Sequence, residues 1–321
     1  MRYGAVPGVG ERVSRLVMGS MVFSVRPIEE VHRLYDRFVA AGGNAFDTAR
    51  VYGRGQTERL FGEWVRQRGA REQITVIGKG AHHDPATGQR RVTPEAIAQD
   101  VATSLDALGM DAIDLYFLHR DDPELSVGPI VEALNEQARL GRLRAFGGSN
   151  WSQARIEAAK QYALARGLRP FAASSPNLAL PVPNEPMWLN CVSLSGDAEA
   201  IRWYVQSRLP VFAWSSQARG FFSGRFAPER PEVDRDVTRV YYAEGNWERL
   251  RRAGELAREK GATPTQIALA WVLHQPLEVF ALIGPLSEGE LEDCLGALEV
   301  SLTEDELSWL NLEGERAVAH R

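Results

Sequence analysis

The chain has 321 residues, of which 44 % are hydrophobic and 25 % charged, and its formal net charge is −5. That length is ordinary for one (β/α)8 barrel, and the apolar share is large enough for a buried core. The mild acidic excess argues against nucleic acid or an anionic membrane as a partner, because both select basic surfaces. No apolar run reaches membrane-spanning length, no signal-peptide pattern opens the chain, and Cys191 and Cys294 suit free thiols in a reducing compartment. We therefore expect a cytoplasmic protein.

The N-terminal residues predict a β-hairpin followed by a first barrel strand within 13–18. Gly8-Val9-Gly10 is a poor dinucleotide fingerprint, because Val13 stands where the third glycine belongs. Strands and helices then alternate. The expected strands cover 44–47, 74–79, 113–119, 143–147, 170–174, 211–214 and 279–283. The expected helices cover 28–41, 57–68, a stretch from 93, 129–140, 152–166, 197–207, 246–260, 263–273 and 288–298.

Eight strand–helix pairs without a composition break predict an α/β fold, a single (β/α)8 TIM-barrel domain over residues 1–321. The N-terminal hairpin and extra C-terminal helices, including one over 303–314, would lie outside this barrel. Two long loops, 175–197 and 219–246, follow strands and should therefore cover the C-terminal face. Their aromatic residues either wall a substrate pocket or anchor the loops to the barrel: Trp188, Phe221, Phe222, Tyr241 and Tyr242.

Three consecutive predicted strands end on chemically active side chains. Asp47 ends the first, Lys79 the second and His119 the third, and Tyr52 follows Asp47 closely. The C-terminal ends of parallel barrel strands meet at one mouth, so these four residues should lie together. A lysine ammonium favours the phenolate and is expected to lower the pKa of Tyr52 from its reference value of about 10. With Asp47 keeping Lys79 charged and His119 orienting the oxygen, Tyr52 would give a proton to a carbonyl, and a cofactor must then supply the hydride.

Each of these residues alone has a plainer interpretation. Asp47 and Lys79 would form an ion pair, Tyr52-Gly53 a turn, and His119 a buried rim histidine. The ordered set of four on three consecutive strands is what points to catalysis. His82-His83-Asp84 has no further ligands at metal-binding spacing, so we expect no metal site.

Five short segments occur in a fixed order: Phe46-Asp47-Thr48-Ala49, Tyr52-Gly53, Gly78-Lys79, Leu118-His119-Arg120 and Gly148-Ser149-Asn150. Together they resemble the aldo-keto reductase family, and the similarity covers almost the entire chain, from the N-terminal hairpin and Leu16 to Gly284. The resemblance implies a (β/α)8 barrel that binds NADP(H), or sometimes NAD(H), and transfers hydride to aldehydes or ketones. It implies Tyr52 as acid/base, Lys79 and Asp47 as the groups that tune it, and His119 as the group that orients the carbonyl.

The resemblance also implies the positions of cofactor contacts. Ser149 and Asn150 match the residues that hold the nicotinamide carboxamide, and Trp214 is placed to stack on the ring. The family's usual glutamine and tyrosine partners fall at Ala173 and Pro176, so Ser175 or Asn177 would replace the missing amide contact. After Trp214, the cofactor pyrophosphate would be wrapped by Ser215, Gln217, Arg219 and Gly220, with Arg219 supplying the charge. The remaining expected cofactor contacts are Ser20, Met21, Gly284, Ser287 and Glu290. The expected substrate pocket consists of Phe23, Trp151, Trp188 and Tyr242.

The end of the chain that would meet the adenosine departs from the family pattern. Leu286, Glu288 and Glu290 occupy a stretch in which NADP-binding members carry basic residues. A carboxylate there should repel a 2′-phosphate and could instead accept a ribose hydroxyl, although amides near Ser287 at a helix start can bind phosphate. NADP(H) is expected first because of the family, and NAD(H) stays open.

Three hypotheses for function follow. The first is an NAD(P)H-dependent oxidoreductase that acts on a small aldehyde, ketone or sugar-type carbonyl, or on the corresponding alcohol. The second is a cofactor-binding regulatory subunit that resembles potassium-channel beta subunits, with little turnover. The third, a barrel isomerase or glycosidase using Asp47 with another carboxylate, leaves Lys79 and Ser149-Asn150 unexplained.

Overall fold

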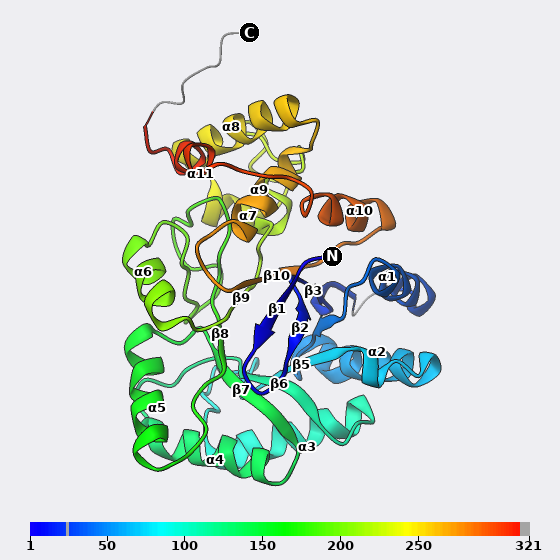
Figure 1. Cartoon of the computed structure of the whole chain (residues 1–321), viewed down its shortest axis with the longest axis vertical. Helices are drawn as coiled ribbons and strands as arrows, with labels where there is room; N and C mark the ends of the chain where they lie inside the picture. The colour runs from blue at the N-terminus through cyan, green and yellow to red at the C-terminus, as the bar shows by residue number, and fades with distance from the viewer. Residues whose placement is uncertain (24–25, 315–321) are drawn as a thin grey trace.

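A computed structural model describes residues 1–23 and 26–314 (Figure 1). Eight parallel strands close into a barrel in the order β10-β3-β4-β5-β6-β7-β8-β9, which confirms the predicted (β/α)8 fold. The barrel strands are β3 Leu16–Gly19, β4 Ala45–Asp47, β5 Thr75–Gly80, β6 Ile113–Leu118, β7 Leu143–Ser149, β8 Ala173–Ser175, β9 Val211–Ala213 and β10 Val279–Ile283.

The N-terminal hairpin closes one end of this barrel. It consists of β1 Tyr3–Val6 and β2 Gly10–Ser14, which pair antiparallel. Val6 and Val13 of the hairpin pack with the side chains that fill the barrel interior, among them Phe117 and Phe280. Gly8 has φ +76° in the turn between the two strands, a conformation that glycine adopts at little cost. Gly8-Val9-Gly10 is therefore a hairpin turn.

Helices surround the barrel (Figure 1), and several of them start at a residue whose side chain caps the helix. Thr93, Ser152, Asp197, Thr263 and Ser287 each accept a hydrogen bond from a backbone amide in the first helical turn. No helix among residues 1–23 and 26–314 is long and apolar enough to cross a membrane. The α-helices are α1 Ile28–Ala40, α2 Gln56–Arg68, α3 Pro94–Leu108, α4 Val127–Arg139, α5 Gln153–Ala165, α6 Ala198–Ser207, α7 Arg235–Tyr241, α8 Glu244–Lys260, α9 Pro264–Leu273, α10 Glu288–Gly296 and α11 Glu304–Leu310. Short 3-10 turns are η1 Met21–Phe23, η2 Tyr52–Gly55, η3 Arg71–Gln73 and η4 Ala218–Gly220.

Two differences from the predicted elements lie near the C-terminus. The second long loop contains α7, whose N-cap Asp234 accepts hydrogen bonds from the amides of Asp236 and Val237. The last helix ends at Leu310 rather than near 314, because Leu312 and Gly314 have positive φ.

The aromatic residues of the second long loop mostly anchor it to the protein. Phe221, Phe222 and Tyr241 are buried in the hydrophobic core. Tyr242 packs edge-on against Trp247, and its hydroxyl donates to the backbone oxygen of Arg230. For these residues the structure favours anchoring over a pocket wall.

Candidate active site

A buried ion pair lies at the C-terminal ends of β4 and β5. Lys79 Nζ donates to Asp47 Oδ1, and both side chains are almost completely buried. The strand register places Asp47 beside Gly19 of β3 and Ile77 of β5, so the pair stands at the barrel mouth. Lys79 Nζ also lies 3.4 Å from the Tyr52 hydroxyl. The three residues that the sequence places at one mouth therefore lie in contact through Lys79.

A tight turn brings Tyr52 back over the ion pair. In η2, Gly53 and Arg54 both adopt left-handed φ/ψ, and the Tyr52 amide donates to Ala49 O at 3.0 Å. Gly55 has φ +87°, a conformation that other residues rarely adopt, so the turn favours glycine there. Tyr52 is partly exposed, and its ring faces the mouth.

His119 follows β6 directly and completes the group of four. Its ring packs edge-on against Tyr52, with ring centroids 5.8 Å apart, and against His82 at 4.8 Å. The Nδ1 atom is buried and has no hydrogen-bond partner among the residues that the structure describes, whereas Nε2 is not among the buried unpartnered atoms. Nε2 is therefore the ring nitrogen that a substrate oxygen can reach.

The protonation states of these groups follow from burial and charge. Burial is the largest single influence on the pKa of Lys79 and lowers it. The charge of Asp47, the neighbouring Tyr52 and the hydrogen bonds to both together outweigh burial, so the pKa stays above its ordinary value and the lysine is charged. Burial raises the pKa of Tyr52, and the charge of Lys79 offsets only part of this rise. Burial and then the charge of Lys79 hold the pKa of His119 well below its usual value, so the imidazole is neutral.

The expected lowering of the Tyr52 pKa is therefore wrong for this structure. The phenol is desolvated more strongly than Lys79 can compensate, so Tyr52 keeps its proton at neutral pH. A protonated phenol beside an ammonium and a neutral imidazole can donate a proton to an oxygen that gains negative charge. The arrangement suits reduction of a carbonyl.

A second buried carboxylate lies behind the Tyr52 turn. Glu58 is fully buried, neither of its oxygens has a hydrogen-bond partner among the described residues, and Arg50 Nη1 is 3.8 Å from Oε2. Burial raises the pKa of Glu58 from 4.5 to about 7. Because the folded pKa lies above the unfolded one, the contribution of Glu58 to stability is complete below about pH 4.5 and is lost as pH rises through about 7.

We expect Glu58→Gln to flatten this pH dependence. Between pH 4.5 and 8 the free energy of unfolding of the wild type should fall by about 3 kcal/mol relative to Glu58→Gln. Urea unfolding of both proteins across this range measures the difference, and the exposed Glu72→Gln is the control that should run parallel to the wild type. Parallel curves for Glu58→Gln and the wild type would refute the assigned titration of Glu58.

Residues expected to hold the nicotinamide lie beside the four catalytic candidates. Ser149 Oγ donates to Ser175 O at 2.8 Å, and Asn150 Nδ2 donates to His119 O at 3.3 Å. Asn150 Oδ1 accepts from the indole Nε1 of Trp214 at 3.2 Å. The protein therefore already uses these amide and hydroxyl groups, and Asn150 holds the Trp214 ring through the indole nitrogen. Trp214 is half-buried and packs against Trp188 with centroids 5.4 Å apart.

Ser20 and Met21 follow β3 at the same mouth. Ser20 is buried, and its hydroxyl has no hydrogen-bond partner in the described part of the chain. Met21 is 41 % exposed in η1. An orphaned buried hydroxyl beside Asp47, whose carbonyl accepts from the Ser20 amide at 2.9 Å, fits a polar group of a bound cofactor.

The segment after β9 has the backbone of a ligand-binding loop. Ser215, Ala218, Arg219 and Gly220 all have positive φ, and non-glycine residues in this conformation cluster at ligand clamps. The Arg219 guanidinium pairs with Asp234 at 3.0 Å, so any phosphate must share it with that carboxylate. Turns with successive amides in this conformation form anion-binding concavities, which fits the predicted pyrophosphate contact.

The start of α10 is acidic, and its side chains form hydrogen bonds with backbone amides of the same segment. Ser287 caps the helix by accepting from the Glu290 amide at 3.2 Å, and Glu290 Oε2 accepts from the Leu286 amide at 2.7 Å. Gly284, Glu288 and Glu290 are exposed. The Leu286 amide, which could otherwise donate to a phosphate, therefore donates to the Glu290 carboxylate. Gln217, on the β9 side, accepts from Cys294 of α10 at 3.5 Å.

Two of the four expected substrate-pocket residues lie in the core instead. Phe23 is 1 % exposed and packs edge-on against Tyr35. Trp151 is fully buried against Phe171, and its Nε1 donates to the backbone oxygen of Arg120. Trp188 alone of the four lies at the mouth beside Trp214, since Tyr242 packs within the second loop. Neighbouring core rings decide these positions, and no local pattern in the sequence records them.

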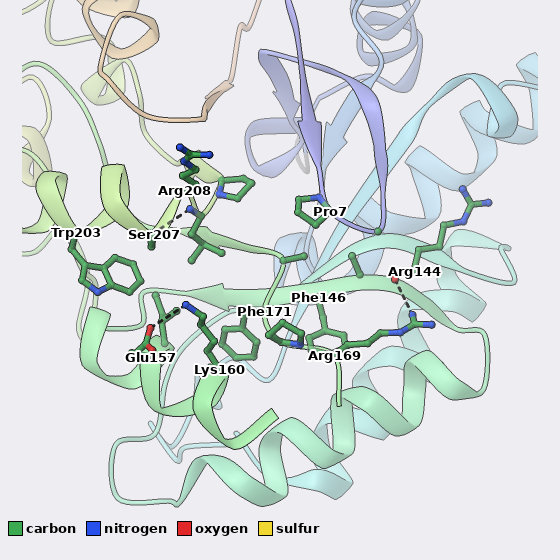
Figure 2. Close-up of a pocket in the computed structure, with 17 residues that line it drawn as sticks. Pro7, Arg144, Phe146, Glu157, Lys160, Arg169, Phe171, Trp203, Ser207 and Arg208 are labelled. Atoms are coloured by element: carbon green, nitrogen blue, oxygen red, sulfur yellow. Dashed lines mark hydrogen bonds and ion pairs between the residues drawn. The ribbon is translucent and has the colours of Figure 1, made fainter. Parts of the chain in front are cut away.

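A cavity of about 580 Å³ lies at the other end of the barrel (Figure 2). It is lined by the hairpin turn Pro7-Gly8, by residues that precede or begin β7, β8 and β9, and by side chains of α5 and α6. Figure 2 shows the charged groups of Arg144 and Arg208 extending away from its centre. The N-terminal ends of barrel strands rarely carry catalysis, and none of the four catalytic candidates lines this cavity.

Comparison with known proteins agrees with the geometry. The sequence model of the aldo/keto reductase family matches residues 15–311. The uncharacterised oxidoreductase YrpG of Bacillus subtilis is 29 % identical over 97 % of this chain and 95 % of its own. The aldo-keto reductase yakc [NADP(+)] of Schizosaccharomyces pombe is 30 % identical over 82 % of this chain and 76 % of its own.

Solved structures share the fold. A thermostable aldo-keto reductase, Tm1743, whose structure was solved with the inhibitor epalrestat, superposes with a TM-score of 0.75 at 22 % identity, covering 98 % of this chain and 100 % of its own. The chain belongs to the aldo/keto reductase family, and it is an NAD(P)-dependent oxidoreductase.

Proposed function

We propose that the protein reduces an aldehyde, ketone or sugar-type carbonyl to the alcohol, or catalyses the reverse reaction, with Tyr52 as general acid/base. The observation that carries the proposal is the environment of one hydroxyl. Tyr52 keeps its proton because burial raises its pKa, and it lies 3.4 Å from the charged Lys79 and next to the neutral ring of His119. No simpler role accounts for a buried cation, a phenol and an imidazole at the mouth of one barrel.

Each side chain has a distinct role in this proposal. His119 Nε2 orients the carbonyl oxygen by a hydrogen bond, and Tyr52 donates its proton as negative charge develops there. Lys79 stabilises the phenolate that remains, and Asp47 keeps Lys79 protonated through their ion pair. In the oxidative direction Tyr52 accepts the proton from the alcohol.

A nicotinamide cofactor supplies the hydride when bound. The residues that fit it are the orphaned hydroxyl of Ser20, the half-buried ring of Trp214, and the positive-φ loop from Ser215 to Gly220. We propose NADP(H) as this cofactor, which accords with the name of the relative yakc. Glu290 weakens the preference, because its carboxylate lies where a 2′-phosphate would approach α10.

NADH and NADPH should both quench the tryptophan fluorescence of the protein, and NADPH should bind more tightly. With the tighter cofactor, the enzyme should then reduce members of a panel of aldehydes and ketones. Glu290→Gln should tighten NADPH binding about fivefold and leave NADH unchanged, because it removes about 1 kcal/mol of exposed charge repulsion. Comparison of the wild type with Trp214→Phe identifies the part of the fluorescence quenching that comes from Trp214 at the barrel mouth.

Tighter binding of NADH would overturn the cofactor assignment. Tight binding of either cofactor without reduction of any carbonyl would overturn the proposed function and favour a cofactor-sensing role.

A further inference from the structure

Arg120 is a buried arginine without an acidic partner at the active-site mouth. Only 6 % of the residue is exposed, and its Nη1 donates to the backbone oxygen of His119 at 2.8 Å. Among residues 1–23 and 26–314, no carboxylate forms an ion pair with its guanidinium. Arginine is rarely this buried unless it is paired, because an uncompensated buried charge is costly.

The acidic residues beside Arg120 are already neutralised by other arginines. Asp121 pairs with Arg155 at 2.9 Å, and Asp122 pairs with Arg90 at 2.8 Å. Asp47, the nearest carboxylate within the group of four, pairs with Lys79. The mouth of the barrel therefore carries one positive charge that no side chain of the described protein compensates.

Hydrogen bonds on both sides fix this charge at the mouth. The His119 oxygen that accepts from Arg120 also accepts from Asn150 Nδ2 at 3.3 Å. On the other side, the Arg120 backbone oxygen accepts from Trp151 Nε1 at 3.2 Å. No nitrogen of Arg120 is both fully buried and unpartnered in the described structure. Its Nε and Nη2 atoms therefore remain accessible to a ligand. The charge of Arg120 also acts on Tyr52. Burial raises the pKa of Tyr52, and the positive charge of Arg120 partly opposes that rise.

The cofactor phosphates are not the partner of this charge. The proposed pyrophosphate loop follows β9, and α10 follows β10. In the closed strand order β6, which leads into Arg120, stands opposite β10. Arg120 therefore faces the substrate side of the mouth.

We propose that Arg120 binds a carboxylate carried by the carbonyl substrate, so that the enzyme acts on oxo acids or on aldehydes bearing an acid group. This inference rests on the proposed carbonyl reduction. Nη1 is held by the His119 oxygen, which leaves Nε and Nη2 for the two oxygens of a carboxylate. The planar guanidinium of arginine can make this bidentate contact, whereas the ammonium of lysine cannot. It would fix the acid group while Tyr52 and His119 meet the carbonyl.

The test compares the 2-, 3- and 4-carboxybenzaldehydes with their methyl esters as substrates. In the wild type, kcat/KM for at least one acid should exceed that for its ester by about tenfold to a hundredfold, as expected for a hydrogen bond to a charged group. In Arg120→Met this acid-to-ester ratio should fall to about one, and in Arg120→Lys it should be intermediate. Arg202→Met, an exposed arginine on α6, should keep the wild-type ratio.

Benzoate provides a measurement that does not depend on the variants folding. It should inhibit reduction of the methyl esters by the wild type competitively, at least tenfold more strongly than benzamide does. Equal kcat/KM for every acid and its ester, or a ratio that survives in Arg120→Met, would overturn the role of Arg120 while leaving carbonyl reduction intact. Failure to reduce any of the six compounds with either cofactor would overturn both proposals.

Discussion

Tyr52→Phe is expected to lower kcat for carbonyl reduction by about 100-fold to 10,000-fold, the range that general acid catalysis contributes. The Tyr52 phenol contacts both Lys79 and His119, and its proton is retained because burial raises its pKa. Phenylalanine keeps the ring and its edge-on contact with His119, so cofactor binding should be unchanged. Fluorescence titration of the cofactor and steady-state reduction of an aldehyde measure the two effects separately.

Tyr116→Phe is the matched control. Tyr116 lies on β6, is fully buried, and its hydroxyl has no partner in the described structure. Removing that hydroxyl takes away an unsatisfied buried polar group, so stability should be equal or higher and turnover unchanged. If Tyr52→Phe retained more than a tenth of wild-type kcat, another proton donor would have to be found.

The barrel and the group of four could be predicted because their signals are local. Apolar runs that end on Asp47, Lys79 and His119 recur at intervals typical of strand–helix pairs. Once the strands are parallel in one barrel, their ends must share a face. The starts of two helices could also be predicted, since Thr93 and Thr263 can cap a helix and each directly precedes a proline.

Other features depend on contacts between distant segments, and the sequence does not record them. Phe23 and Trp151 were expected at the pocket, but partners such as Tyr35 and Phe171 draw them into the core. The sign of the Tyr52 pKa shift also depends on burial, which outweighs the neighbouring charge.

The free charge of Arg120 cannot be predicted from the sequence for the same reason. In the sequence it stands directly before Asp121 and Asp122, which suggests local neutralisation. The structure instead pairs these acids with Arg155 and Arg90, more than thirty positions away. The useful signal is that a cation follows the strand-end histidine directly, but only the tertiary pairing reveals that the cation is free.

Lys79→Met is expected to destabilise the protein by about 3–5 kcal/mol near pH 8, because it leaves the Asp47 carboxylate buried without a cation. The loss should be smaller at low pH. Burial already raises the pKa of Asp47 against the opposing charge of Lys79, and without that charge the carboxyl can protonate more readily. Urea unfolding at pH 5.5 and 8 measures both values.

A double variant separates stability from catalysis. Lys79→Met combined with Asp47→Leu replaces the buried ion pair by apolar side chains, an exchange that is often neutral for stability. The double variant should therefore recover most of the free energy of unfolding that the single variant loses. It should not recover turnover, because Tyr52 still lacks the cation that stabilises its phenolate. Recovery of turnover along with stability would mean that Lys79 supports the fold only, whereas a loss below 1 kcal/mol in the single variant would mean that Asp47 does not depend on it.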